Sequence, residues 1–222
     1  MTGEQPQEGP REVPPPSDPG DLYVLGGMYF QGITVPVDKP KAAALYRMSA
    51  DKGNDDAMVR LGIMLMTGDG VEQDYREASK LFMRAKGRGN ADAEYLLSSL
   101  YSRGKGIDYN PIEAVKLCMH SAALGCVGAM CQLGKWYRDG ENYMDVDMAK
   151  AVYWLKKAAE QNYSEALYEL GCMFAFGEKV QKDVENGRTL LEYADKYGDP
   201  DAKAALEALE RGEERRPDDR VP

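Results

Sequence analysis

A pattern that recurs every 36 or 37 residues constrains the fold of this chain more than any other feature. A leucine marks each of five units, and an aromatic residue or a leucine stands four positions later. Three positions further on, every unit has a glycine. The marker leucines are Leu25, Leu61, Leu97, Leu133 and Leu170. A fixed period of about 20 to 50 residues is the signature of a solenoid, in which stacked neighbours bury a core that no single unit could bury.

Each column of the repeat predicts part of a helix pair. The leucine and the residue four positions later share one helical face. The recurring glycine tolerates a positive φ and predicts the end of the first helix. An Asp or Asn then suits the N-cap of a second helix. The predicted caps are Asp38, Asp74, Asn110, Asp147 and Asp183. The chain is therefore predicted to be all-α, a right-handed α/α superhelix of about five helix-turn-helix repeats.

The periodicity also places the boundaries. We expect repeats at residues 21–54, 55–90, 91–126, 127–162 and 163–198, followed by a capping helix at 200–211. The proline-rich residues 1–20 and the charged residues 212–222 are predicted to be disordered tails. The fourth repeat departs from the pattern, because it carries one extra residue and its loop, Gly140 to Asp145, lacks a second glycine.

Composition excludes several classes of protein. The formal net charge is −9 and the pI is about 4.8, which argues against binding of nucleic acid through its phosphates. The first 20 residues hold one basic residue and no apolar run, unlike a signal or transit peptide. No stretch approaches the roughly 18–20 apolar residues that cross a bilayer. We expect an intracellular, soluble and cytoplasmic protein without membrane insertion, and an organellar location stays open.

The candidates for chemistry are few. The four cysteines form no C-x-x-C pair and there is one histidine, His120, so no zinc site, other metal or cofactor is predicted. Cysteine thiols are expected, although a Cys131–Cys172 disulfide stays possible because both lie on equivalent helices of neighbouring repeats. His120 is predicted to be a surface residue, and no partnered nucleophile accompanies it. We predict no catalytic residues and no enzymatic activity.

These columns resemble the Sel-one-like repeat, a relative of the tetratricopeptide repeat. The second repeat carries the motif at Ala57, Leu61, Gly62, Gly68, Gly70, Val71, Asp74, Ala78 and Gly89. The resemblance implies a non-catalytic adaptor or scaffold that assembles or regulates a multiprotein complex. An enzyme or a small-molecule sensor that uses the concave pocket is the alternative. Relatives linked to β-lactam chemistry carry a cysteine pair in each repeat, which this sequence lacks, so that activity is not transferred.

By analogy with tetratricopeptide arrays, variable positions on the first helices should line a concave surface. The partner-binding candidates are Tyr23, Phe30, Val59, Ile63, Met66, Tyr95, Arg103, Lys135, Arg138, Tyr168 and Phe176. The early repeats offer apolar side chains and the middle repeats offer basic ones. This order predicts a groove for a peptide or helix that carries an apolar anchor and acidic groups. Alternatively, the apolar candidates pack between repeats. The sequence predicts no oligomeric state.

Overall fold

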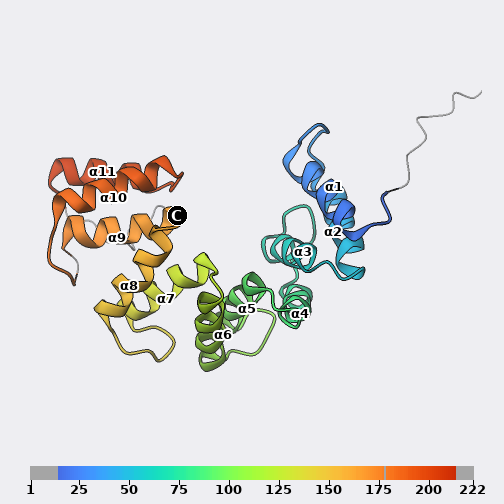
Figure 1. Ribbon diagram of the computed structural model, residues 1–222, viewed down its shortest axis with the longest axis horizontal. Coiled ribbons are helices and arrows are strands. Elements are labelled where there is room, and N and C mark those ends of the chain that lie inside the picture. The colour runs from blue at the N-terminus through green and yellow to red at the C-terminus, as the bar shows by residue number, and fades with distance from the viewer. Residues whose placement is uncertain (1–14, 178, 214–222) are drawn as a thin grey trace, which may run out of the picture. The chain divides into compact units, whose positions relative to one another are not determined.

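The computed structural model describes residues 15–177 and 179–213. Within these ranges the chain forms eleven α-helices and no strands, which confirms the predicted all-α class (Figure 1). Most of the two predicted tails, residues 1–14 and 214–222, lies outside the described residues. The first helix begins at Pro19, two residues before the predicted start of the solenoid.

The chain divides into two compact units, and the division falls in the sequence between the two helices of the second repeat. Residues 1–74 hold α1 (Pro19–Gln31), α2 (Lys39–Asp51) and α3 (Asp55–Thr67). The second unit, residues 75–222, holds the remaining helices. They are α4 (Tyr75–Lys86), α5 (Ala91–Arg103), α6 (Pro111–Ala123), α7 (Val127–Asp139), α8 (Met148–Ala159), α9 (Ser164–Phe176), α10 (Val184–Lys196) and α11 (Ala202–Arg211).

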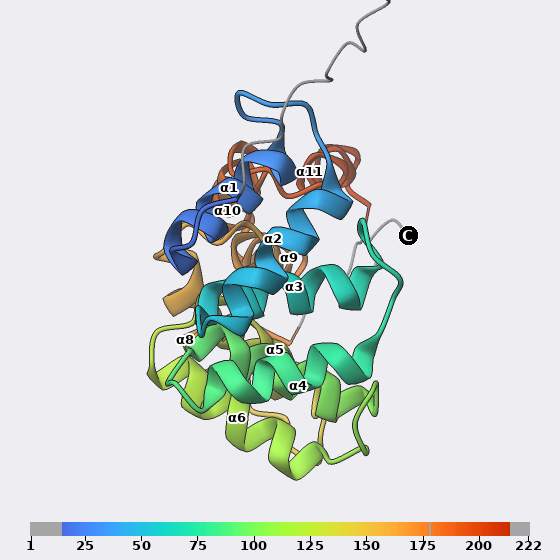
Figure 2. The same ribbon diagram turned by 90° about the vertical axis from the view of Figure 1, so that its right-hand side faces the viewer.

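Within each unit, helices that are consecutive in the chain pack against each other. The two views show this for α9, α10 and α11 at the C-terminal end of the chain, where the helices lie side by side (Figures 1 and 2). In the second unit, α5 also contacts α7, and α9 contacts α11. First helices of successive repeats are therefore neighbours in this unit, as a solenoid requires.

The helix ends follow from the columns of the repeat. Four of the predicted caps, Asp38, Asn110, Asp147 and Asp183, accept hydrogen bonds from backbone N–H groups three residues later. The five recurrent glycines each end a first helix with φ between 62° and 77°. This left-handed conformation is one that residues with a β-carbon rarely adopt.

A second positive-φ position, two residues after each of these glycines, recurs in all five loops. It is occupied by Thr34, Gly70, Gly106, Asn142 and Lys179. Gly70 and Gly106 pack so closely that an added β-carbon would lie 2.5 Å from Lys39 and 2.3 Å from the backbone of Tyr75. The backbone shape of the loop is thus kept in every repeat, although its residue changes.

Small residues let the two helices of a repeat approach each other. Gly134 of α7 packs on Leu155 of α8, where a β-carbon would lie 2.5 Å from the leucine Cγ. The alanines of the second helices are fully buried at Ala42, Ala78, Ala114 and Ala151. Four marker leucines, Leu61, Leu97, Leu133 and Leu170, are also buried, whereas Leu25 in the first repeat is half-buried.

All four cysteines are buried thiols. Cys131 and Cys172 therefore do not form the disulfide that the sequence left possible. Among the described residues, no helix has both the length and the apolar character needed to span a membrane.

Candidate partner-binding pockets

Three of the predicted binding residues meet at one pocket in the first unit. Tyr23 and Phe30 on α1 and Ile63 on α3 line a cavity of about 250 Å³. The remaining lining residues are Val24, Gly27, Gln31, Tyr46, Arg60 and Met64. We call this cavity the α1–α3 pocket. It lies between the first helices of the first two repeats. The sequence predicted an apolar anchor site in these two repeats.

Aromatic rings form one wall of the α1–α3 pocket. The centroids of Tyr23 and Tyr46 are 5.7 Å apart and their planes are tilted by 43°. Burial raises the pKa of Tyr46, and the nearby Tyr23 adds to this effect, so the hydroxyl stays protonated. Gly27 stands two residues after the marker leucine, where the next repeats have Ile63 and Ser99. The missing side chain leaves room at the pocket.

Arg60 places a positive charge at the α1–α3 pocket. It is exposed, and a side-chain hydrogen bond with Tyr23 raises the pKa of its guanidinium above the ordinary value. Arg60 was not among the predicted binding residues, although it lies three residues before Ile63 and therefore on the same helical face. An apolar cavity beside a guanidinium suits an apolar side chain that is followed by a carboxylate.

The other two candidates in the first unit differ in exposure. Val59 is 7% exposed and belongs to the core, so it does not face a partner. This is the alternative in which apolar candidates pack between helices. Met66 is half-buried on α3 but does not line the α1–α3 pocket.

Arg138 on α7 was predicted to bind acidic groups of a partner, and the structure corrects this prediction. Its side chain is 1% exposed. The guanidinium donates to both carboxylate oxygens of Asp139, at 2.7 Å each, and to Oε2 of Glu169 on α9. The carboxylates that the sequence assigned to a partner come instead from the chain's own helices.

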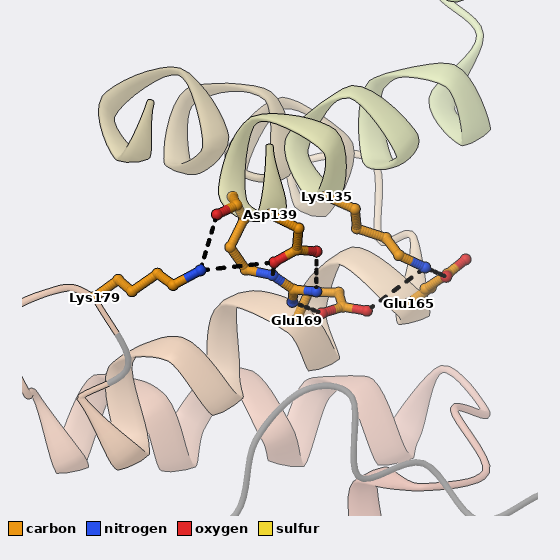
Figure 3. A network of polar contacts seen from close by, with 6 residues as sticks. Lys135, Asp139, Glu165, Glu169 and Lys179 are labelled. Carbon is orange, nitrogen blue, oxygen red and sulfur yellow. Dashed lines mark hydrogen bonds and ion pairs between the residues drawn. The ribbon is translucent and has the colours of Figure 1, made fainter. Parts of the chain in front are cut away.

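Lys135 belongs to the same charged network (Figure 3). Its Nζ lies 3.0 Å from Oε1 of Glu165 and 3.9 Å from Oε1 of Glu169. Burial alone would lower the pKa of Lys135, but these two carboxylates outweigh it and raise the pKa. Lys179 closes the other end, with Nζ 3.9 Å from Oδ1 of Asp139. Three cations and three carboxylates therefore balance between α7, α9 and the loop that follows α9.

The aromatic candidates of the later repeats are largely packed. Tyr168 is fully buried within α9, which corrects its prediction as a partner-binding residue. Phe176 is half-buried against the core formed by α9, α10 and α11. Tyr95 on α5 is half-buried, and Gly128 approaches its ring so closely that a β-carbon would lie 2.9 Å away. Burial raises the pKa of Tyr95 above its ordinary value.

A second cavity, of about 400 Å³, lies in the second unit between α5, α7 and the loops that follow them. Only one predicted residue, Arg103, lines it. The full lining is Ser99, Ser102, Arg103, Tyr109, Gln132, Trp136, Glu141 and Asn142. We call this cavity the α5–α7 pocket. The sequence signal that could have found it is the altered loop of the fourth repeat, which supplies Glu141 and Asn142.

The paired helices, their caps and their small-residue contacts define an α/α solenoid repeat protein. The family model of the Sel1 repeat matches residues 21–54, 55–90, 91–125, 127–163 and 164–194. The chain belongs to the Sel1 repeat family, and this confirms the resemblance seen in the sequence. No curated protein sequence gave a significant match.

Solved structures show the same fold. A Sel1 repeat protein from Oxalobacter formigenes is 28% identical, with a TM-score of 0.75, and the alignment covers 87% of this chain and 78% of that one. The protective antigen c5321 of uropathogenic Escherichia coli, which displays an SLR fold, is 26% identical with a TM-score of 0.62. That alignment covers 88% of this chain and 50% of the antigen, so the chain spans half the antigen's length.

The immunity protein Pa5087 of Pseudomonas aeruginosa is 20% identical, with a TM-score of 0.63. The alignment covers 90% of this chain and 81% of that protein. At this identity the likeness supports the fold alone.

Proposed function

We propose that the chain is a protein-interaction module whose α1–α3 pocket takes an apolar side chain of a partner protein. Sel1 repeat proteins generally act as protein-interaction scaffolds. The observation that carries the proposal is the meeting of Tyr23, Phe30 and Ile63, from two different helices, around one cavity. A cavity of about 250 Å³ is smaller than most sites for drug-sized ligands and suits one or two side chains.

The acidic group expected of the partner is proposed to pair with Arg60 rather than with the basic residues of the middle repeats. Arg138 and Lys135 are engaged by carboxylates of the chain itself, whereas the exposed Arg60 lines the apolar cavity. A partner segment with an apolar residue and an acidic residue close to it would fill the pocket and pair with the guanidinium.

The module is proposed to act by binding rather than by catalysis, in a soluble, cytoplasmic complex. Neither pocket is lined by a cysteine or a histidine. These are the side chains that most often serve as nucleophile or general base. The acidic composition supports a protein partner over a nucleic acid.

The proposal is tested by quantitative affinity capture from native cells, with Val24→Asp compared against the unmodified chain. Val24 lines the α1–α3 pocket and is 59% exposed, so a carboxylate there should leave folding intact. Met48→Asp is the matched control, because Met48 is exposed on α2 outside the lining. Burying one apolar side chain contributes roughly 1.5–3 kcal/mol, so the affinity for a pocket-bound partner should fall by at least about tenfold.

A second variant, Arg60→Gln, reports on the charge. It should weaken capture of the same partner that Val24→Asp loses, and circular dichroism should show unchanged helix content for both. Partners retained equally by Val24→Asp, Arg60→Gln and Met48→Asp would show that the α1–α3 pocket is not the interaction site.

A further inference from the structure

The α5–α7 pocket lies at the loop of the fourth repeat, which carries one extra residue. In the second and third repeats the second positive-φ position is a glycine. Gly70 packs on the first residue of α2, and Gly106 packs on the first residue of α4. In the fourth repeat this position is Asn142, with φ 55°, and it has a side chain. Asn142 and its neighbour Glu141 line the pocket.

The walls of the pocket supply hydrogen-bonding groups. Ser99 and Ser102 come from α5, and Gln132 comes from α7. The Ser102 hydroxyl donates to the Ser99 carbonyl oxygen at 3.1 Å, so its oxygen can still accept. The half-buried Gln132 amide has no hydrogen-bond partner within the described part of the chain. Tyr109 adds exposed aromatic surface, and Trp136, which is 2% exposed, also lines the cavity.

Two opposite charges line the same cavity without pairing. Arg103 and Glu141 are both exposed, and neither makes an ion pair with any residue that the structure describes. The contrast with Lys135 and Arg138 is direct, because those cations are matched by carboxylates of the chain. A ligand complementary to the α5–α7 pocket must therefore carry a negative and a positive group together.

We propose that the α5–α7 pocket binds a small zwitterionic ligand of the amino acid or dipeptide class. Its carboxylate would pair with Arg103, since a guanidinium matches a carboxylate geometrically. Its ammonium would pair with Glu141, and Gln132 and the two serines would bind polar atoms between the charges. The volume of about 400 Å³ falls within the range of small-molecule sites. This inference goes beyond the proposed function, because it concerns different residues in different repeats.

The test uses the tryptophan within the pocket. The chain has two tryptophans, Trp136 and Trp154, and only Trp136 lines the cavity. In a full-length Trp154→Phe background, fluorescence of Trp136 is followed while a panel of free dipeptides is added. The best dipeptide is then compared with its N-acetylated and its C-amidated forms, which lose one charge each.

Matched variants assign the charges. Arg103→Gln and Glu141→Gln remove the two pocket charges, while Arg88→Gln and Glu192→Gln remove the same charges at exposed positions outside the lining. Loss of one charged hydrogen bond should weaken binding about tenfold. We expect Arg103→Gln to lower the affinity for the free dipeptide. This variant should no longer bind the free dipeptide more tightly than its C-amidated form. Glu141→Gln should abolish the preference over the N-acetylated form.

Two results would overturn the proposal. The first is the absence of a saturable fluorescence change with any dipeptide up to about 10 mM. The second is that the two pocket variants bind the dipeptide as tightly as the two control variants do. A peptide blocked at both ends, with Glu and Lys side chains, tests the other source of the same charges. If it binds and free dipeptides do not, the pocket recognises a protein surface and the small-ligand proposal is wrong.

Discussion

Arg138 of α7 and Glu169 of α9 form an ion pair in which both side chains are almost completely buried, with exposed fractions of 1% and 2%. The pair joins the first helices of the fourth and fifth repeats, 31 residues apart in the chain. Two desolvated charges stabilise a structure only when each has its partner, because an isolated buried charge is far costlier than a matched pair. The contact between these repeats therefore depends on both residues together.

Removing one member of this pair should be strongly destabilising. Glu169→Gln removes a carboxylate from the buried Arg138 guanidinium, which keeps its contact with Asp139, and a loss of about 3–5 kcal/mol in the free energy of unfolding is expected. The measurement is urea denaturation followed by circular dichroism. In the double variant Arg138→Met, Glu169→Gln both charges are gone, so its loss should be clearly smaller than the sum of the single losses. Additive losses would contradict a coupled pair.

The repeat architecture could be predicted from the sequence because each of its signals is local. A cap such as Asn110 contacts a backbone group three residues away, and Gly104 ends a helix through its own φ. Four of the five marker leucines and the alanines of four second helices are buried in the same way. Such short-range rules need no knowledge of the neighbouring repeat.

Exposure of the candidate binding residues was harder to predict, because it depends on the register within a helix. Arg103 stands six residues after the marker Leu97, whereas Arg138 stands five residues after Leu133. One residue turns the side chain by about 100° around an α-helix. Arg103 is therefore exposed at the α5–α7 pocket, while Arg138 points into the contact with α9. Treating the two arginines as one basic surface overlooked this rotation.

Neither pocket could be derived from the columns alone. The α1–α3 pocket depends on Gly27 at a position where other repeats have a side chain, and on the approach of Tyr46 from α2. The α5–α7 pocket depends on an altered loop. Gly27 and the altered loop are both departures from the repeat. The sequence shows where these departures occur, but it does not show what space they leave in the folded chain.

The loop glycines should differ in their tolerance of a side chain. Gly89 has φ 85° and no atom within 4 Å of an added β-carbon, whereas Gly106 has φ 69° and the backbone of Tyr75 at 2.3 Å. Gly89→Ala should therefore cost only the backbone strain, about 1–2 kcal/mol. Gly106→Ala adds the displacement of packed backbone and should reach about 3 kcal/mol or more. Thermal unfolding of both variants gives the comparison, and equal losses would show that the Gly106 loop moves away freely.

Alkaline pH should destabilise the fold through its buried thiols. Burial raises the pKa of Cys118 to about 12 from an ordinary value of 9.0. The Cys118 thiol therefore holds its proton more tightly in the native state than in the unfolded state. Its contribution to the free energy of unfolding is complete below pH 9 and is lost as the pH rises towards 12. Between pH 8 and pH 10.5 the unfolded thiol ionises, and Cys118 alone should lower the free energy of unfolding by roughly 2 kcal/mol.

Urea denaturation at the two pH values measures this loss, and Cys118→Ala should reduce the difference by about the same amount. Thiol-reactive reagents provide an independent readout. The buried cysteines should react slowly with a disulfide reagent in the native protein and rapidly in urea. A pH dependence that is unchanged in Cys118→Ala would assign the effect to other groups.

His120 is expected to stabilise the fold although most of its own side chain is exposed. Its Nδ1 lies 2.6 Å from Oε2 of Glu94, and the Glu94 side chain is only 6% exposed. His120→Ala leaves this buried carboxylate on α5 without its imidazole partner, which should cost about 1–3 kcal/mol. Met119→Ala, at the adjacent and exposed position of α6, should change stability by less than about 0.5 kcal/mol. Adding Glu94→Leu to His120→Ala should recover much of the loss, because the buried carboxylate that lost its partner is then also removed. If His120→Ala and Met119→Ala are equally stable, Glu94 must reach solvent or another donor without the histidine.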